Sequence, residues 1–180
     1  MQYTCVKISH KTLMEQCRIQ VIQGKMLRST LFNNNAAGQI PFDRHAPPTS
    51  RPLISCLRAC NGLGFVYSVL LGVYTGAGTY ILSPFDFFVN PQIWFDALHK
   101  YKIKDAFASY SMMAHAVHAM RTGSLRPFSL HNMENLMIPL DGRPQPHMFR
   151  AIASTFIQHR LSDQSISNVY TPIFQPFGLI

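Results

Sequence analysis

The segment Asp141-Gly142-Arg143-Pro144-Gln145-Pro146 carries the side chains best placed to bind a ligand. It follows the apolar run Asn135–Leu140, which predicts a buried strand, and it precedes a helical pattern. In open α/β sheets, ligands bind at the carboxyl ends of the strands. The same residues also suit an ordinary turn, because Asp-Gly bends the chain and proline fits a helix start. The residues alone support a ligand loop and a simple turn equally.

Two histidines, His115 and His118, have a spacing that can bind a metal ion. They lie opposite the apolar stripe of their predicted helix, and no third ligand is identifiable, so we expect a solvated helix face. The eight acidic residues form no close pair for acid–base chemistry. Gly62-Leu63-Gly64 lacks the third glycine and the lysine of a phosphate-binding loop. We therefore assign no catalytic and no metal-binding residue.

The four cysteines form no CxxC pair and lie in apolar stretches. They are Cys5, Cys17, Cys56 and Cys60. No second pair completes a zinc site with Cys56 and Cys60. We interpret all four as buried, reduced thiols of a cytoplasmic protein. The N-terminal residues show no secretory signal.

The composition favours a folded domain with anionic partners. Of the 180 residues 47% are hydrophobic, and 16 basic against 8 acidic residues give a net charge of +8. The basic residues are scattered, and the densest cluster, 99–104, suits the solvated C-terminal end of a helix. No aromatic-basic platform or groove-reading motif is present, so we do not expect nucleic-acid binding.

Short apolar strands alternate with helices that each carry one apolar stripe. This alternation predicts the α/β class, with a mostly parallel sheet flanked by helices. Ser9 and Asn90-Pro91 are predicted to begin two of the helices. Residues 29–52, with three Asn and four Pro, are predicted to be a loop or a disordered insert. The expected strands are Tyr3–Ile8, Leu53–Leu57, Gly78–Leu82, Asp105–Ser109, Asn135–Leu140 and Ile166–Tyr170.

Residues Ala59–Phe85 contain no charge and five glycines. The stretch Leu63–Leu82 is long enough to span a membrane. However, Gly76-Ala77-Gly78 is typical of a helix that ends before a strand begins. We therefore expect a turn at 62–64, a buried helix to about Tyr74 and a buried strand from about Gly78, rather than a membrane span.

The order of several weak motifs resembles the AMP-dependent synthetase/ligase, or adenylate-forming, superfamily. The greatest similarity is to fatty-acyl-AMP-ligase-like domains of the disco-interacting protein 2 type and their fungal relatives. The matching stretches are Val6–Leu13, Asn61–Phe65, Tyr74–Pro84, Lys100–Ile103, Asp141–Pro146 and Ser167–Tyr170. In their order, the resemblance extends over nearly the whole chain except 29–52. The resemblance implies a partial N-terminal adenylation domain over residues 1–180.

The resemblance also implies roles for particular residues. Asp141, Gly142, Arg143 and Pro144 correspond to the loop whose backbone lies along the adenine, so they are candidates for binding ATP or AMP. Candidates for the substrate pocket are Asn61, Gly64, Ser109, Tyr110 and Tyr170. Ser109 and Tyr110 have an equally supported alternative interpretation, as a helix cap and a core aromatic.

Some parts of the family pattern are missing. The phosphate loop would precede Met1, and the ribose-binding Asp and the domain with the catalytic Lys would follow Ile180. The Glu that helps to hold Mg²⁺ in the family is absent after Tyr170. We therefore expect this chain to be part of an ATP-dependent, carboxylate-activating enzyme and to be inactive by itself. Its partners would be a nucleotide, a fatty-acid-like carboxylate and the remainder of the ligase chain. The alternative is a noncatalytic interaction or lipid-sensing module.

Overall fold

The computed structural model of the protein describes residues 7–23, 52–60, 62–140 and 146–170. Its centre is a five-stranded sheet with the strand order β2-β1-β3-β4-β5. Every neighbouring pair of strands is parallel, as the sequence predicts. The strands are β1 (Leu53–Ser55), β2 (Thr79–Ile81), β3 (Asp105–Phe107), β4 (Asn135–Leu140) and β5 (Ile166–Tyr170).

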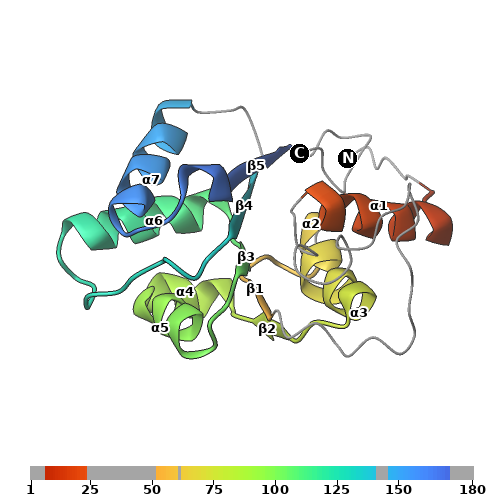
Figure 1. Cartoon of the computed structure of the whole chain (residues 1–180), viewed down its shortest axis with the longest axis horizontal. Helices are drawn as coiled ribbons and strands as arrows, with labels where there is room; N and C mark the ends of the chain where they lie inside the picture. The colour runs from red at the N-terminus through yellow and green to blue at the C-terminus, as the bar shows by residue number, and fades with distance from the viewer. Residues whose placement is uncertain (1–6, 24–51, 61, 141–145, 171–180) are drawn as a thin grey trace, which may run out of the picture.

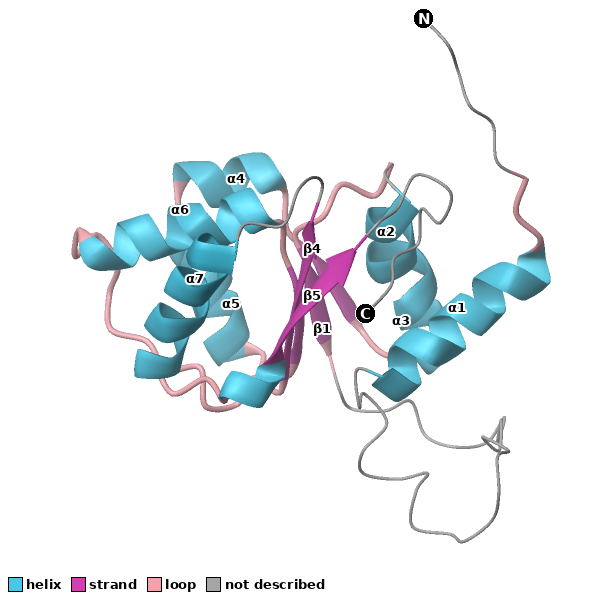
Figure 2. Cartoon of the chain, turned by 90° about the horizontal axis from the view of Figure 1, so that it is seen from above, coloured by secondary structure: helices cyan, strands magenta, loops and turns pink. Residues whose placement is uncertain are grey.

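Helices cover both faces of the sheet (Figures 1 and 2). One face carries α1 (His10–Gln23), α2 (Gly62–Phe65) and α3 (Leu71–Thr75), the last two joined by the π-helical turn Val66–Leu70. The other face carries α4 (Pro84–Val89), α5 (Gln92–Lys100), α6 (Tyr110–Arg121) and α7 (Pro146–Gln158). A short 3-10 turn, Asp163–Ser165, precedes β5. This three-layer arrangement confirms the α/β class.

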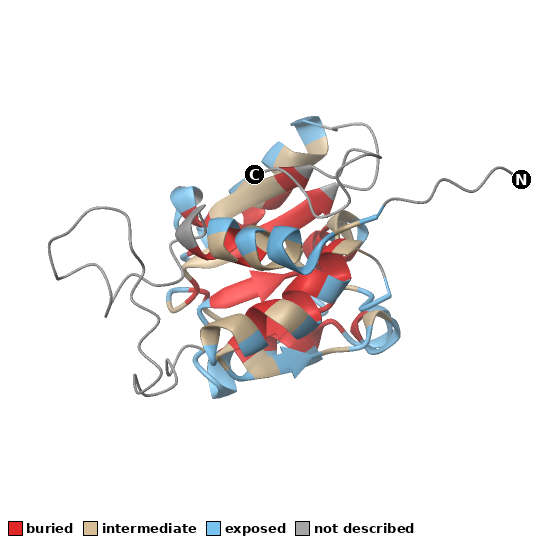
Figure 3. Cartoon of the chain, turned by 90° about the vertical axis from the view of Figure 1, so that its right-hand side faces the viewer, coloured by how far each residue is buried: buried red, intermediate tan, exposed pale blue. Residues whose placement is uncertain are grey.

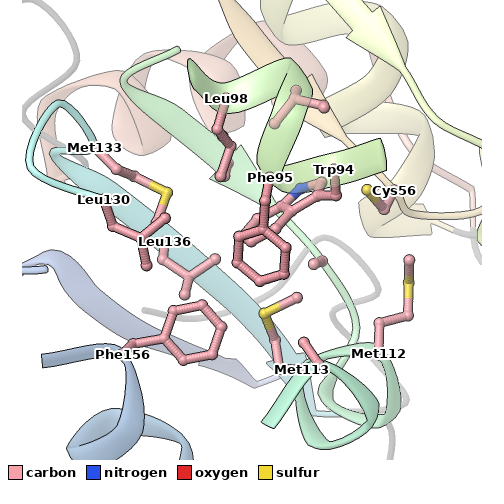
Figure 4. Close-up of a cluster of buried hydrophobic side chains, with 14 of the residues drawn as sticks. Cys56, Trp94, Phe95, Leu98, Met112, Met113, Leu130, Met133, Leu136 and Phe156 are labelled. Carbon is pink, nitrogen blue, oxygen red and sulfur yellow. The ribbon is translucent and has the colours of Figure 1, made fainter. Parts of the chain in front are cut away.

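Two hydrophobic cores hold the layers together. The larger core fills the space between the sheet and α4–α7, where Trp94, Phe95 and Phe156 are essentially inaccessible to solvent (Figure 4). The smaller core lies under α1–α3, where the rings of Tyr67 and Phe107 stack with centroids 4.2 Å apart. Burial of these aromatic side chains supplies much of the driving force for folding, at about 25 cal/mol per Å² of apolar area.

Side-chain caps begin three of the helices. Ser9 Oγ accepts a hydrogen bond from the Thr12 amide at 3.1 Å, and Asn90 Oδ1 accepts one from the Gln92 amide at 3.1 Å. Each satisfies an amide that has no partner inside the helix. The predicted helix start at Ser9 is therefore confirmed. The predicted start at Asn90-Pro91 is confirmed to within a residue, because α5 begins at Gln92 with Pro91 in the N-cap position. Ser109 caps α6 in the same way, as described below.

The uncharged stretch is helical from Gly62 to Thr75 and is followed by a strand, so the predicted order of helix and strand is confirmed. The expected turn at 62–64 is wrong, because helix α2 already begins at Gly62. The helical segment is buried on one side only, since Phe65, Val69 and Val73 are exposed. Gly76 ends α3 with a left-handed φ of 68°, a conformation that glycine adopts without strain. Gly72 lets the helix approach the sheet, because a Cβ there would lie 2.0 Å from Thr79 Oγ1. Within the described residues, no helix has both the length and the apolar character to cross a membrane.

The expectation of a buried strand from Gly78 is wrong. Side chains of Tyr80 and Ile81 are exposed, and the burial pattern of β2 runs from intermediate to exposed. The physical reason is the position of β2 at the edge of the described sheet, where only β1 pairs with it. In Figure 3, β2 is the exposed, pale blue strand at the lower margin.

Two further expectations need correction. Pro84–Val89 form helix α4, where the sequence analysis predicted only the end of a strand at Ser83-Pro84. Cys17 and Cys56 are buried, free thiols, but Cys60 is exposed, because it lies in the connection between β1 and α2. Residues 3–6 of the predicted strand Tyr3–Ile8, Cys5 among them, and residues 29–51 of the insert 29–52 lie outside the described residues.

Candidate ligand-binding site

A cavity of about 230 Å³ opens at the carboxyl ends of the parallel strands. Cys56 follows β1, Pro84 follows β2, Ser109 follows β3, and Pro139 lies near the end of β4. Because all the strands run in one direction, these ends meet at one edge of the sheet. The complete lining is Cys56, Leu57, Arg58, Leu63, Gly64, Pro84, Phe88, Ser109, Ser111, Met112 and Pro139.

The inner wall of the cavity is apolar and continuous with the larger core. Figure 4 shows Cys56 and Met112 at the same end of that core, away from Leu130 and Met133. Phe88 of α4 adds a half-exposed aromatic wall. An apolar wall of this kind suits a hydrocarbon group more than a charged one.

The ring of Phe88 packs against His115, with centroids 5.3 Å apart. His115 is partly buried there, whereas His118 is exposed. The expectation that both histidines lie on a solvated face is therefore wrong for His115. Among the described residues, no group of three or more His, Cys, Asp or Glu side chains could hold a metal ion.

Polar groups gather at the opening of the cavity. Ser109 Oγ accepts a hydrogen bond from the Met112 amide at 3.4 Å and lies 3.1 Å from Ser111 Oγ. Ser109 is thus both the N-cap of α6 and a lining residue. Arg58 adds an exposed cation. Hydroxyl groups, a helix N-terminus and a guanidinium together make this opening favourable for a carboxylate or phosphate ester.

Gly64 fixes the loop that carries Arg58. A Cβ on residue 64 would lie 1.9 Å from the Arg58 carbonyl oxygen and 2.6 Å from its carbonyl carbon. Only glycine therefore lets the loop after β1 lie directly on α2. The contact sets the position of Leu57 and Arg58 over the cavity.

The thiol of Cys56 lines the cavity without being a nucleophile. Burial raises the pKa of the Cys56 thiol well above its ordinary value of 9.0. A thiol with a raised pKa stays protonated near neutral pH, and the thiolate is the reactive species. Cys56 therefore contributes apolar surface rather than covalent chemistry.

The other predicted site residues are distributed as follows. Tyr110 packs against the larger core, is not among the lining side chains, and has its pKa raised by desolvation. Asn61 and Asp141, Gly142, Arg143 and Pro144 lie outside the described residues. Tyr170 ends β5, but its side chain is outside the described part. Of the nine predicted residues, the structure thus brings Gly64 and Ser109 together around one cavity.

Sequence reasoning missed Arg58, Phe88, Ser111 and Met112 as lining residues. Arg58 and Ser111 had a usable signal, because each follows a predicted strand by a few residues and so belongs at the ligand-binding edge. Phe88 was missed because helix α4, which carries it, was not predicted.

Comparisons with known proteins place this geometry in context. No protein-family model matches the chain. It is 38% identical over 127 residues to an uncharacterized protein of Schizosaccharomyces pombe, covering 71% of this chain and 8% of that protein. It is 29% identical over 171 residues to the homeostatic regulator of DAG of Saccharomyces cerevisiae, covering 84% of this chain and 10% of that protein. Disco-interacting protein 2 of Drosophila melanogaster is 25% identical over 125 residues, which are 67% of this chain and 7% of that protein. The chain spans about a tenth or less of the length of these relatives.

Solved structures share the fold. A fatty acyl-adenylate ligase from L. pneumophila, in complex with acyl adenylate and pyrophosphate, superposes with a TM-score of 0.70 at 16% identity. The superposition covers 92% of this chain and 25% of the ligase. An adenylation domain of a keto acid-selecting NRPS module bound to keto acyl adenylate gives a TM-score of 0.69 at 16% identity, covering 92% of this chain and 26% of that domain.

Proposed function

We propose that this chain, a homologue of the Disco-interacting protein 2 family with the fold of adenylate-forming enzymes, forms the acyl-binding part of an acyl-adenylate-forming domain. The observation that supports the proposal most is the cavity at the carboxyl ends of β1, β3 and β4. Its apolar inner wall suits an acyl chain, and its opening with Ser109, Ser111 and Arg58 suits the polar carboxyl end.

In such a reaction a carboxylate oxygen attacks the α-phosphorus of ATP, the bond to pyrophosphate breaks, and an acyl adenylate forms. This chain's own contribution is to bind and orient the carboxylate. Orientation of that kind lowers a reaction barrier by removing translational and rotational freedom before the reaction. The apolar wall of Leu63, Phe88 and Met112 also excludes water from the acyl group.

In this proposal, the nucleotide binds beside the cavity. Pro139 of β4 lines the cavity, and Asp141, Gly142, Arg143 and Pro144 follow the same strand. This position supports the proposed contact of the loop with adenine. A Mg²⁺ ion would accompany ATP in the family, but the described residues provide no donor set for it, and we assign it no ligand.

We propose further that the chain does not adenylate by itself and works with the remainder of a ligase polypeptide. The described residues that line the cavity include two serines and one arginine, and a single guanidinium does not neutralise a triphosphate. Catalysis of phosphoryl or adenylyl transfer depends mainly on such electrostatic stabilisation. Release of pyrophosphate from ATP and a fatty acid by the purified chain would refute this part.

The binding proposal is tested with a stable acyl-sulfamoyl-adenosine analogue and isothermal titration calorimetry. The variant Ser111→Trp places an indole at the cavity opening, and because Ser111 is exposed the fold should tolerate it. Ser154→Trp is the matched control, since Ser154 is an exposed serine on α7 away from the cavity. We expect binding by the unaltered chain and Ser154→Trp, and a loss of at least about tenfold in Ser111→Trp. Equal affinities for both variants would contradict the proposed site.

A second candidate function is a noncatalytic interaction or lipid-sensing module. The observation that favours it is the name of one relative, homeostatic regulator of DAG, which describes regulation rather than adenylation. The two functions differ in their ligand. Binding of a free fatty acid or diacylglycerol in the cavity, with no effect of the adenosine part of the analogue, would support the second function.

A further inference from the structure

Two buried serines join the helix of the uncharged stretch to strand β1. Ser55 ends β1 and Ser68 lies in the π-helical turn Val66–Leu70, and their exposed fractions are 0% and 3%. Their Oγ atoms lie 2.7 Å apart, in a hydrogen bond for which either hydroxyl can be the donor. Because this bond is buried, it fixes the helix against the strand and gives both hydroxyls a partner.

The Ser55 hydroxyl also binds the loop that lines the cavity. Its Oγ accepts a hydrogen bond from the Leu57 amide at 3.3 Å. Leu57 and Arg58 both line the cavity shortly after the end of β1. The preceding amide, that of Cys56, instead donates to the Phe107 carbonyl of β3 at 2.8 Å. The sheet backbone therefore holds Cys56, whereas a serine side chain holds Leu57.

The geometry of the helix directs Ser68 at β1. Gly64, Ser68 and Gly72 follow one another at intervals of four residues. A Cβ on Gly64 would overlap the Arg58 carbonyl. A Cβ on Gly72 would overlap the Thr79 hydroxyl. In an α-helix of about 3.6 residues per turn, a row with this spacing drifts around the helix. The π-helical turn, with its wider i→i+5 bonds, reduces the drift. Ser68 therefore lies between two close contacts and faces the same side.

Packing alone does not require hydroxyl groups at this interface. When both partners of a buried hydrogen bond are replaced by apolar groups, the stability of a protein changes little. Two alanines would therefore also let the helix lie on β1. They would not provide an acceptor for the Leu57 amide, so the serine pair does something in the loop that apolar side chains cannot do. The π-helical turn agrees with this, because such turns are frequent at functional sites.

We propose that Ser55 and Ser68 are positioning residues of the cavity, which hold Leu57 and Arg58 where they orient the acyl ligand. Ser68 fixes the Ser55 hydroxyl, Ser55 binds the Leu57 amide, and Arg58 follows at the polar opening. Neither serine lines the cavity, so both act through the loop. The consequence is a higher affinity, because a loop that is already ordered loses less freedom when the ligand binds. This role rests on the proposed function of the cavity.

Hydrogen exchange of two neighbouring amides, followed by NMR on the full chain, tests the positioning without any ligand. Ser55→Ala and Ser68→Ala should each speed exchange of the Leu57 amide by about fivefold, as expected for the loss of one hydrogen bond. In Ser68→Ala the Cys56 amide should keep its exchange rate, because its acceptor belongs to β3. A substitution that merely loosened the whole fold would speed both amides by the same factor.

Binding of the acyl-sulfamoyl-adenosine analogue to the same variants is measured by isothermal titration calorimetry. We expect each single variant to bind about fivefold more weakly than the unaltered chain. The double variant should bind no more weakly than Ser55→Ala, because the two serines act through one series of contacts.

Thr155→Val is the matched control. It also removes a buried hydroxyl, which donates to the Ala151 carbonyl of α7 at 2.8 Å and does not line the cavity. It should change neither the exchange of the Leu57 amide nor the affinity for the analogue. Circular dichroism checks that every variant folds.

Three results would overturn the proposal. They are unchanged exchange of the Leu57 amide in Ser68→Ala, equal acceleration of the Cys56 and Leu57 amides in that variant, and unchanged affinity in a variant whose Leu57 amide exchanges faster. If the unaltered chain does not bind the analogue, the proposed function fails. The exchange of the Leu57 amide then still decides whether the two serines hold the loop.

Discussion

Replacing Gly64 by alanine tests how the loop after β1 and helix α2 together build the cavity. The added Cβ would lie 1.9 Å from the Arg58 carbonyl oxygen, whereas ordinary contact begins at 3.4 Å. The loop must therefore move by the difference, about 1.5 Å, to relieve the overlap. The atoms it meets belong to the backbone, so no side-chain rotation can provide the space.

The expected change in the free energy of unfolding of Gly64→Ala follows from two opposing effects. Overpacking of a tight contact costs about 1–3 kcal/mol. Alanine in place of glycine within a helix stabilises the helix by up to about 1 kcal/mol. We expect a net loss of about 1 kcal/mol in the free energy of unfolding, together with weaker binding of the acyl-sulfamoyl-adenosine analogue, because Leu57 and Arg58 are displaced.

Gly78→Ala is the matched control for this experiment. A Cβ on residue 78 meets no heavy atom within 4 Å, and its backbone is not left-handed. Its unfolding free energy should stay within about 0.5 kcal/mol of the unaltered chain. Urea denaturation followed by circular dichroism measures both variants. If Gly64→Ala and Gly78→Ala were equally stable and bound the analogue equally, the reasoning about the loop would be refuted.

Three further predictions concern the helix cap and the ionisable groups. Ser109→Ala should lower the free energy of unfolding by about 1 kcal/mol in urea denaturation, because it removes the N-cap of α6; an unchanged stability would contradict the cap. Iodoacetamide at pH 7.5 should alkylate Cys60 and leave Cys56 unmodified in the folded chain, as peptide mass spectrometry would show; rapid labelling of Cys56 would contradict its burial. Burial also raises the pKa of Cys56 and of Tyr67 above their ordinary values of 9.0 and 10.0. Both groups ionise more readily in the unfolded chain, so their contribution to stability is complete below pH 9 and falls as the pH rises further. Denaturation curves between pH 7 and 11 measure this, and a stability that rises over that range would disprove it.

The parts of the fold that local signals determine could be predicted from the sequence. Ser9 and Asn90 are side chains that accept hydrogen bonds from helix amides, and they begin the helices that their types predict. The apolar runs that became β1, β3 and β4 are buried in a parallel sheet, where continuous apolar sequence is expected.

Features that depend on distant parts of the chain were not predictable. The sequence of β2 resembles a central strand, but its burial depends on the order of strands in the sheet, which no residue in β2 encodes. Helix α4 did have a local signal, because Pro84 follows Ser83 and Asp86 lies in the first turn. The sequence analysis instead interpreted Ser83-Pro84 only as the end of a strand.

The candidate site was predictable in position but only partly in residues. Parallel topology places ligand groups at the carboxyl ends of strands. Gly64 and Ser109 were named from the resemblance to the family. Phe88 and Met112 reach the cavity from helices whose rotation depends on tertiary packing. Such packing is set by the whole core rather than by local sequence.

One measurement tests the central claim, that the cavity holds the acyl part of an acyl adenylate, most directly. An acyl-sulfamoyl-adenosine analogue with a diazirine on its acyl chain is photolysed on the full chain, and the adducts are mapped by mass spectrometry. We predict adducts on the lining residues Leu63, Phe88 and Met112 that disappear in Ser111→Trp and persist in Ser154→Trp. Adducts that lie outside the cavity lining, or that survive in Ser111→Trp, would contradict the claim.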